Sequence, residues 1–382
     1  MTTTEAVAAP DIPRRGGTDL LYVALVARPA VDWADRTRLA RAMTLALHEV
    51  GLHAGRAVAG PEGIVVTCTS RAREWDIDIL ATSLTTWRER LHSTPVAGAQ
   101  PPTSPAELIT ALTFDSVDDS AGPQREGRLA ALLPTLVFDV VVSGGGNTGD
   151  LDAARDKICR ALSTGVDDQP PLARPEESAA PETIPEPVAT RRWARVPVRS
   201  SWVRWYRFLT PPADGSEQLA RSLVNVAFGG VHGSLLVDLV RRERGLSYSP
   251  QSTLLHRDGR HLLVIDVQTT PGDESSCDAA IRTALETFSA EPLSDSTMLA
   301  AASYLRGRTI VDRDHMQGAA DERAAVLEGS LPSALDTSRT PAELCASAGT
   351  AISRTLHDLY RPTGFHALVM SPNPCNGKWV EL

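Results

Sequence analysis

The sequence predicts a two-domain α/β protein in which one structural unit occurs twice. A stretch at 167–192 is rich in proline, alanine and glutamate. It cannot bury enough apolar surface to fold alone, and its prolines favour an extended connector. The halves on either side are of similar size and repeat one order of strands and helices, as a duplicated unit would. We therefore expect a flexible tail at 1–17, a first domain at 18–166, a linker at 167–192 and a second domain at 193–382.

Each element of the first domain is predicted from its local pattern. Apolar, β-rich runs predict strands, and apolar residues at helical spacing predict helices. A Ser-Pro-x-Glu start supplies a capping hydroxyl, a proline at the first helical position and an acid in the first turn. The predicted order is a strand at 20–29, a helix at 35–51, a strand at 62–70, a helix at 104–113 and a strand at 135–146.

The second domain repeats this order. Its first helix carries an apolar stripe formed by Leu219, Leu223, Val226 and Ala227, and its late helix begins with Thr-Pro-x-Glu. The predicted order is a strand at 201–210, a helix at 215–230, a strand at 260–270, a helix at 340–349 and a strand at 364–374.

Composition excludes several classes of function. A formal net charge of −9 argues against a nucleic-acid or anionic-membrane partner. No run of 18 apolar residues is present to span a membrane, and the N-terminal stretch has no apolar core typical of a signal peptide. We therefore expect a cytoplasmic protein.

The segment HEVGLH contains two histidines and a glutamate, but not at the spacing of a zinc helix. Such helices place two histidines four residues apart on one face, as in H-E-x-x-H or H-x-x-E-H. His48 and His53 are five apart, which turns one roughly 140° from the other in a helix. We expect His48 to end a helix and His53 to lie beyond it, and favour this over a metal site.

The most specific stretch is FGGVHGSLLVDLVRRERGLSYSPQS, residues 228–252. Its glycines predict a turn in which backbones approach closely, and Ser234 is a good N-cap for a helix that runs to about Arg244. Gly245 is the expected helix stop. The following residues to Ser252 predict a strand with Tyr248 on one face. The buried side of the helix is predicted to carry Leu235, Leu236, Leu239 and Val240.

This stretch resembles the second domain of the pitrilysin/insulinase-type zinc peptidases, the inverzincins. Their pattern is a glycine pair, a Ser-Arg-Leu-like helix start and then L-R-E-E-R-G-L-x-Y-S. Here 244–249 match without a gap, and Val-Arg-Arg-Glu at 240–243 replaces Leu-Arg-Glu-Glu. The start at 234–236, Ser-Leu-Leu, departs at its middle position. The resemblance covers nearly all of 193–382 and, more loosely, the first domain.

The resemblance implies roles for two residues. In that family an arginine and a tyrosine of the second domain reach the substrate at the zinc site, which would be Arg241 and Tyr248 here. Arginine offers a rigid fork of donors, and tyrosine offers a hydroxyl for a developing oxyanion. Gly229, Gly230 and Ser234 are further candidates for substrate binding. The alternative is structural: Arg241 would cap the helix end, and Tyr248 would be a half-buried strand residue.

The zinc helix of the family is missing from the first domain. Neither H-x-x-E-H nor H-E-x-x-H occurs in the chain, and the first predicted strand leads almost directly into the helix at 35–51. Three ligands and a general base are the minimum for this hydrolysis, and none can be assigned. We therefore expect no cofactor in this chain, with zinc held by a partner.

The resemblance implies an α+β fold of two related domains, each a mainly antiparallel sheet with helices packed on one face. It also implies the non-catalytic subunit of a heterodimeric zinc metallopeptidase, which supplies Arg241 and Tyr248 in trans to a homologous zinc-bearing subunit. The substrate would be a peptide, with leader-peptide removal in natural-product maturation as one role. A structural scaffold subunit and a peptide-binding protein that does not cleave remain the alternatives.

Overall fold

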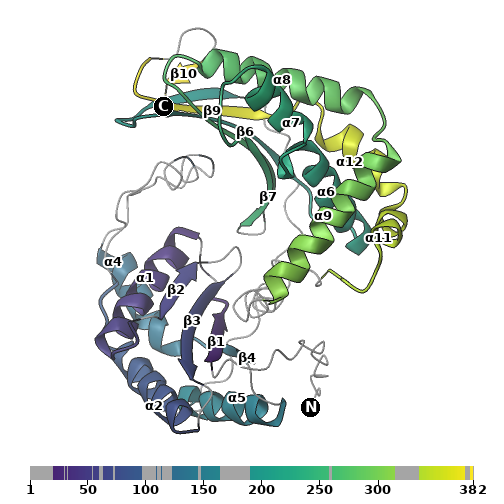
Figure 1. The fold of residues 1–382 in the computed structure, drawn as a ribbon. Coiled ribbons are helices and arrows are strands. Elements are labelled where there is room, and N and C mark those ends of the chain that lie inside the picture. Colours follow the sequence, from purple (N-terminus) through teal and green to yellow (C-terminus); the bar gives the residue numbers. More distant parts are fainter. Residues whose placement is uncertain are drawn as a thin grey trace. The chain divides into compact units, whose positions relative to one another are not determined.

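A four-stranded antiparallel sheet organises the first half of the chain (Figure 1). In this computed structural model the described residues are 20–29, 31, 33–53, 55–59, 63–71, 74–96, 109, 113, 123–144, 148–163, 190–257, 260–314, 335–374 and 379–381. The strand order is β2-β3-β1-β4, and every neighbouring pair is antiparallel. The elements are β1 (Leu20–Ala27), α1 (Trp33–Glu49), β2 (Arg56–Ala59), β3 (Ile64–Arg71), α2 (Glu74–Arg90), α4 (Pro123–Leu132), a 3₁₀ turn (Leu133–Thr135), β4 (Asp139–Gly144) and α5 (Thr148–Ser163).

The central strand β1 is buried on both faces. Side chains alternate across a strand, so Leu21, Val23 and Leu25 enter the core formed with the helices, while Tyr22 and Ala24 lie in a second cluster on the opposite face. This explains why the strand is a continuous apolar run. The predicted strands at 20–29, 62–70 and 135–146 and the helix at 35–51 are confirmed.

A six-stranded sheet organises the second half, in the order β10-β5-β9-β6-β8-β7. β6 pairs antiparallel with β8 and β9, and β7 with β8, while β5 is parallel to β9 and β10. The strands are β5 (Arg191–Arg195), β6 (Ser201–Leu209), β7 (Gln251–Arg257), β8 (Arg260–Thr269), β9 (His366–Ser371) and β10 (Val380–Glu381). The helices are α6 (Gly215–Asn225), a π-helical turn (Val226–Gly230), α7 (Leu235–Val237), a π-helical segment (Asp238–Glu243), α8 (Glu274–Ala290), α9 (Asp295–Asp314), α11 (Pro341–Ala348) and α12 (Ala351–Leu359).

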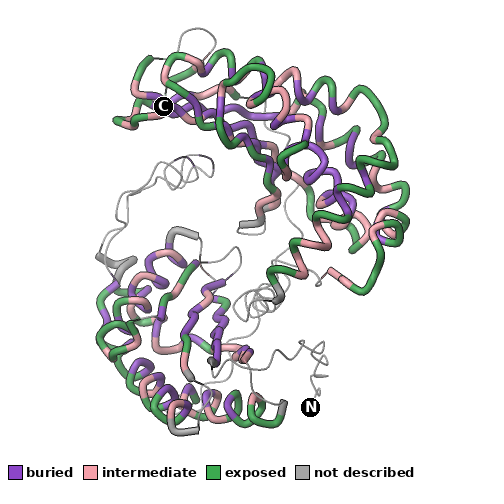
Figure 2. The backbone as a smooth tube through the Cα atoms, in the orientation of Figure 1, coloured by how far each residue is buried: buried purple, intermediate pink, exposed green. Residues whose placement is uncertain are grey.

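Helices cover one face of this second sheet (Figure 1). Val203 and Trp205 of β6 and Ile265 of β8 pack there against Phe228 and Phe288, all nearly inaccessible to solvent. Much of the backbone of this sheet has the purple colour of buried residues (Figure 2). The predicted fold class, two mainly antiparallel sheets each with helices packed on one face, is confirmed. The predicted strands at 201–210, 260–270 and 364–374 and the helices at 215–230 and 340–349 are also confirmed. The last helix begins with a capping box in which Thr340 and Glu343 each bind the other's backbone amide.

The opposite face of the second sheet is also covered, and by residues from the first half of the chain. Ile109 is fully buried in a cluster with Tyr206, Leu262 and other residues of this face. Nearby, Arg204 of β6 forms a two-point ion pair with Asp266 of β8, at 2.7 and 2.8 Å, and also donates to the Thr113 hydroxyl at 3.1 Å. The rest of the predicted helix at 104–113 lies outside the described residues.

The chain divides into two compact units that are not the two continuous halves. The first unit is Met1–Gly98, Ala121–Ala173 and Thr309–Ala334, and the second is Ala99–Ser120, Arg174–Arg308 and Leu335–Leu382. The predicted tail at 1–17 and most of the linker at 167–192 lie outside the described residues. The linker prediction was wrong at its C-terminal end, because Arg191 and Arg192 already belong to β5, which pairs with β9.

The stretch Gly215–Glu243 is the one part of the described chain long and apolar enough to cross a membrane. Its most apolar window is 61% buried inside the second unit, as expected for a core helix. No membrane role follows from it.

Candidate functional site

A buried polar link fixes the π-helical turn that precedes the Arg241 helix. The Asn225 side chain donates to the Ser252 carbonyl at 3.1 Å and accepts from the Ser252 hydroxyl, and the Tyr360 hydroxyl also donates to it. Burial raises the pKa of Tyr360, which keeps its hydroxyl protonated. Because α6 is thereby tied to β7, the turn at Val226–Gly230 has a fixed position. Turns of this kind are frequent at functional sites.

Gly229 lies where the turn meets β7. A Cβ atom built there would stand 2.7 Å from the Ser252 Cβ and 2.9 Å from a methyl group of Leu236, closer than real side chains approach. Only glycine fits without displacing one of them. The close approach predicted from the glycines is therefore confirmed.

Ser234 begins the next helix, but it does not cap it in the predicted way. Its backbone is extended, with φ −80° and ψ 155°, as an N-cap requires. Its hydroxyl donates backward to the Val231 carbonyl at 2.7 Å and makes no capping hydrogen bond. Gly229 and Ser234 are both buried in the chain's own packing. A substrate-binding role for Gly229, Gly230 and Ser234 stays a prediction.

Arg241 and Tyr248 are brought together at the end of this helix. Gly245, with φ +62°, turns the chain, and the Leu246 amide donates back to the Val240 carbonyl at 2.9 Å. The Arg241 guanidinium carbon lies 4.3 Å from the centre of the Tyr248 ring, a cation–π distance. A terminal nitrogen of Arg241 also lies 3.4 Å from His232 Nδ1.

The predicted strand at 246–252 was wrong in its first part. β7 begins only at Gln251, and residues 246–250 form an irregular segment. The reason is Gly245, whose left-handed turn leads into a segment that does not pair with β8. Tyr248 is consequently 79% exposed, not a half-buried strand residue, so the structural alternative for it was wrong.

This geometry leaves both functional groups available. One terminal nitrogen of the Arg241 guanidinium lies against His232, and its other N–H groups have no partner among the described residues, so they remain free to donate. Apart from its contact with Arg241, the Tyr248 ring is exposed, and its hydroxyl has no hydrogen-bond partner among the described residues. The pair can therefore donate hydrogen bonds to a peptide that lies over it.

A cavity of about 350 Å³ opens beside Tyr248. Its walls come from the β5–β6 connection, the irregular segment after the Arg241 helix, and the end of β8 with the turn that follows. The lining residues are Arg199, Ser200, Gly245, Leu246, Ser247, Tyr248, Gln268, Thr269, Thr270 and Pro271. The sequence analysis did not predict the lining residues from the β5–β6 connection or from the end of β8. No local motif distinguishes them, and only the pairing of strands brings them close to Tyr248.

A buried carboxylate, Glu274, follows three residues after Pro271 of the cavity lining. Glu274 accepts from the Ser201 and Ser371 hydroxyls at 2.5 and 2.7 Å and from the Gly272 amide at 2.9 Å. Burial alone would raise the pKa of Glu274, but these hydrogen bonds together leave it lowered. The cluster ties the start of β6 and the end of β9 to the turn that precedes α8.

Glu274→Gln is expected to destabilise the protein at neutral pH and less so in acid. A carboxyl whose pKa is lowered by folding stabilises the native state above its unfolded pKa, near 4.3, and loses that contribution as pH falls. We expect a loss of about 1–3 kcal/mol in the free energy of unfolding at pH 7, because charged acceptors make the stronger hydrogen bonds. Urea unfolding of the wild type and the variant at pH 7 and pH 3 measures this loss. If the difference in the free energy of unfolding between the two proteins is the same or larger at pH 3, this account is contradicted.

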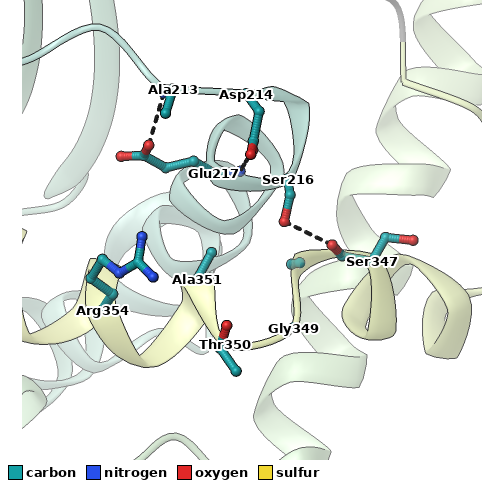
Figure 3. Close-up of a pocket in the computed structure, with 10 residues that line it drawn as sticks. Ala213, Asp214, Ser216, Glu217, Ser347, Gly349, Thr350, Ala351 and Arg354 are labelled. Atoms are coloured by element: carbon teal, nitrogen blue, oxygen red, sulfur yellow. Dashed lines mark hydrogen bonds between the residues drawn. The ribbon is translucent and has the colours of Figure 1, made fainter.

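A second cavity, of about 300 Å³, lies between the start of α6 and the α11–α12 connection (Figure 3). Asp214 caps α6 by accepting from the Glu217 amide at 2.9 Å, and Ser216 donates to the Ser347 carbonyl at 2.8 Å. Asp214 and Ser216 at this cavity thus bind groups of the chain itself. We assign it no function.

No metal centre is found among the residues that the structure describes. His48 lies in the last turn of α1, and His53 lies beyond the end of the helix, as predicted, with ring centres 6.0 Å apart. Within the described ranges, no three His, Cys, Asp or Glu side chains are grouped as metal ligands would be.

Comparison with known proteins finds a similarity to one peptidase family over less than half of the chain. Residues 149–302 match the family model described as the peptidase M16 inactive domain. No curated protein sequence matches the chain.

Solved structures show the fold over nearly the whole chain. A peptidase M16 inactive domain from Pseudomonas fluorescens is 13% identical with a TM-score of 0.62, covering 94% of this chain and 95% of that one. A protease from Helicobacter pylori is 10% identical with a TM-score of 0.65, covering 93% and 95%. The periplasmic protease PqqL from Escherichia coli is 13% identical with a TM-score of 0.55, covering 94% of this chain but 44% of that one.

Proposed function

We propose that this chain, a protein of the M16 peptidase fold that carries the family's inactive domain, is the non-catalytic subunit of a heterodimeric zinc metallopeptidase. The observation that supports this most is the Arg241–Tyr248 pair, which is stacked at 4.3 Å with Tyr248 79% exposed. No group of metal ligands is found among the described residues, so an arginine and a tyrosine held together at the surface have no assigned role within this chain. They are suited to act on a peptide held by another subunit.

Each residue of the pair would have its own task. The Arg241 guanidinium would donate to backbone carbonyls of the peptide and hold its register. The Tyr248 hydroxyl would donate to the oxygen that becomes negative at the scissile carbonyl. Stacking fixes the two donors relative to each other before the peptide arrives, which lowers the entropy cost of ordering them.

The zinc would come from the partner. The sequence contains neither zinc-helix pattern, and the described residues that remain near its expected place do not fit a zinc site, since His48 and His53 have no third ligand beside them. The length of PqqL, of which this chain covers 44%, supports pairing: one protease chain there is long enough for two such folds. We propose a homologous partner carrying H-x-x-E-H, a peptide substrate such as a leader peptide, and a cytoplasmic location.

The test is reconstitution with such a partner. We expect the purified chain to bind less than stoichiometric zinc and to cleave no peptide, the partner alone to bind zinc but cleave slowly, and the mixture to cleave fast. Metal analysis and peptide turnover measure this. One tightly bound zinc per chain, lost when His48 or His53 is replaced by alanine, contradicts the proposal.

A further inference from the structure

We propose that the cavity beside Tyr248 is a binding site for a carboxylate group of the substrate peptide. The inference deepens the proposed function, because it rests on a peptide lying across Tyr248 and names a chemical class for that peptide. The cavity volume, about 350 Å³, is at the lower end of the range for ligand pockets and matches one side chain rather than a cofactor.

The charge of the cavity favours an anion. Arg199 is its one lining residue with a formal charge, and none of the lining residues is Asp or Glu. Arg199 is exposed, and no carboxylate among the described residues pairs with it. The charge of the cavity is thus opposite in sign to the net charge of the chain, which is −9. The nearby acid Glu274 is satisfied by its own hydrogen bonds and lies outside the lining.

The hydroxyl groups of the cavity supply donors that lack acceptors. Ser247 is 8% exposed, and its Oγ is buried without a hydrogen-bond partner in the structure. A buried hydroxyl left unpaired costs free energy, and a single χ1 rotation to another staggered rotamer changes where it donates. Ser200 Oγ already accepts from the Gln268 side chain at 2.6 Å, so its own proton is available to a ligand.

The walls supply apolar contact for the carbon atoms that carry such a carboxylate. Leu246, Pro271 and the Tyr248 ring lie among the lining residues. A cation and two hydroxyl donors beside apolar walls suit an aspartate or glutamate side chain, or the C-terminal carboxylate of a short peptide. Both sources present the same chemistry, and the experiment below separates them.

The measurement uses the full-length chain alone, so it needs neither the partner nor zinc. Three fluorescent peptides of one sequence are compared by anisotropy: one with a central Glu and an amidated C-terminus, one with Gln and a free C-terminus, and one with Gln and an amidated C-terminus. We expect one or both carboxylate peptides to bind more tightly than the neutral peptide. The tighter of the two identifies the side chain or the C-terminus as the source.

The matched variants are Arg199→Gln and Arg195→Gln, the latter an exposed arginine of β5 outside the cavity. Arg199→Gln is expected to weaken carboxylate binding about tenfold to a hundredfold, because it removes a charge-assisted contact. Ser247→Ala should weaken it less, and Arg195→Gln should leave it unchanged. Equal binding of all three peptides, binding of none, or equal losses in both arginine variants overturns the inference. Carboxylate selectivity without any activity in the reconstituted complex would instead leave the site standing and defeat the proposed function.

Discussion

Tyr248→Phe is expected to lower peptide turnover by the reconstituted complex about a hundredfold to a thousandfold, the cost of one lost oxyanion donor. The melting temperature and the affinity for the partner should not change, because the Tyr248 ring is 79% exposed and the ring stays in place over Arg241. Turnover, melting temperature and complex formation are measured on the same preparations. A matched control is Tyr304→Phe, which removes a hydroxyl from another partly exposed tyrosine, on α9.

Arg241→Ala should also lower turnover, with a larger effect on substrate binding than Tyr248→Phe has. Its control is Arg242→Ala, the adjacent residue, which forms an exposed ion pair with Asp238 worth little to stability. If the chain is a scaffold, the Tyr248 and Arg241 variants will cleave as fast as wild type. That result would exclude catalysis in trans and favour the structural role.

Asp266→Leu is expected to produce the largest loss of stability, about 3–5 kcal/mol in the free energy of unfolding, because it leaves the buried Arg204 guanidinium without its carboxylate. The two side chains are 5% and 13% exposed and bind at two points, so solvent cannot replace the lost partner. Urea unfolding measures the loss.

The double variant Arg204→Leu, Asp266→Leu should be less destabilised than Asp266→Leu alone. Replacing both members of a buried pair by apolar residues is often nearly neutral, since neither charge is left unpaired. Thr113 would keep its hydrogen bond to the Ile109 carbonyl at 2.6 Å. The single variant Arg204→Leu is measured as well. If the double variant loses as much free energy of unfolding as the two single variants together, the two side chains are not energetically coupled.

Much of the fold could be predicted because its elements have strong local patterns. The strand predicted at 20–29 is an apolar run over 20–27, where both its faces are buried, and the helix at 340–349 carries a complete capping box. The strand after Gly245 was mispredicted because its residues favour a strand, while pairing with β8, which is not local, begins only at Gln251. The local sequence pattern also did not predict that Ile109 is buried against the second sheet.

The sequence predicted only those residues of the candidate site that lie together in one continuous stretch. Arg241 and Tyr248 lie seven residues apart in a single motif, so their proximity followed from the helix, its glycine stop and the resemblance. Arg199 and Gln268 reach the same place through the sheet, in which β6 pairs with β8. No local spacing encodes such a contact.

The contact between Thr113 and Arg204, which are 91 residues apart in the chain, also constrains the order in which the protein can fold during synthesis. When Ile109 and Thr113 leave the ribosome, the strands that will bury them have not yet been made. Their apolar and polar groups must stay exposed until β6, β8 and β9 are complete, and closing so long a loop is slow. The N-terminal half therefore cannot reach its final state as an independent folding unit, although the sequence pattern alone presents it as a domain.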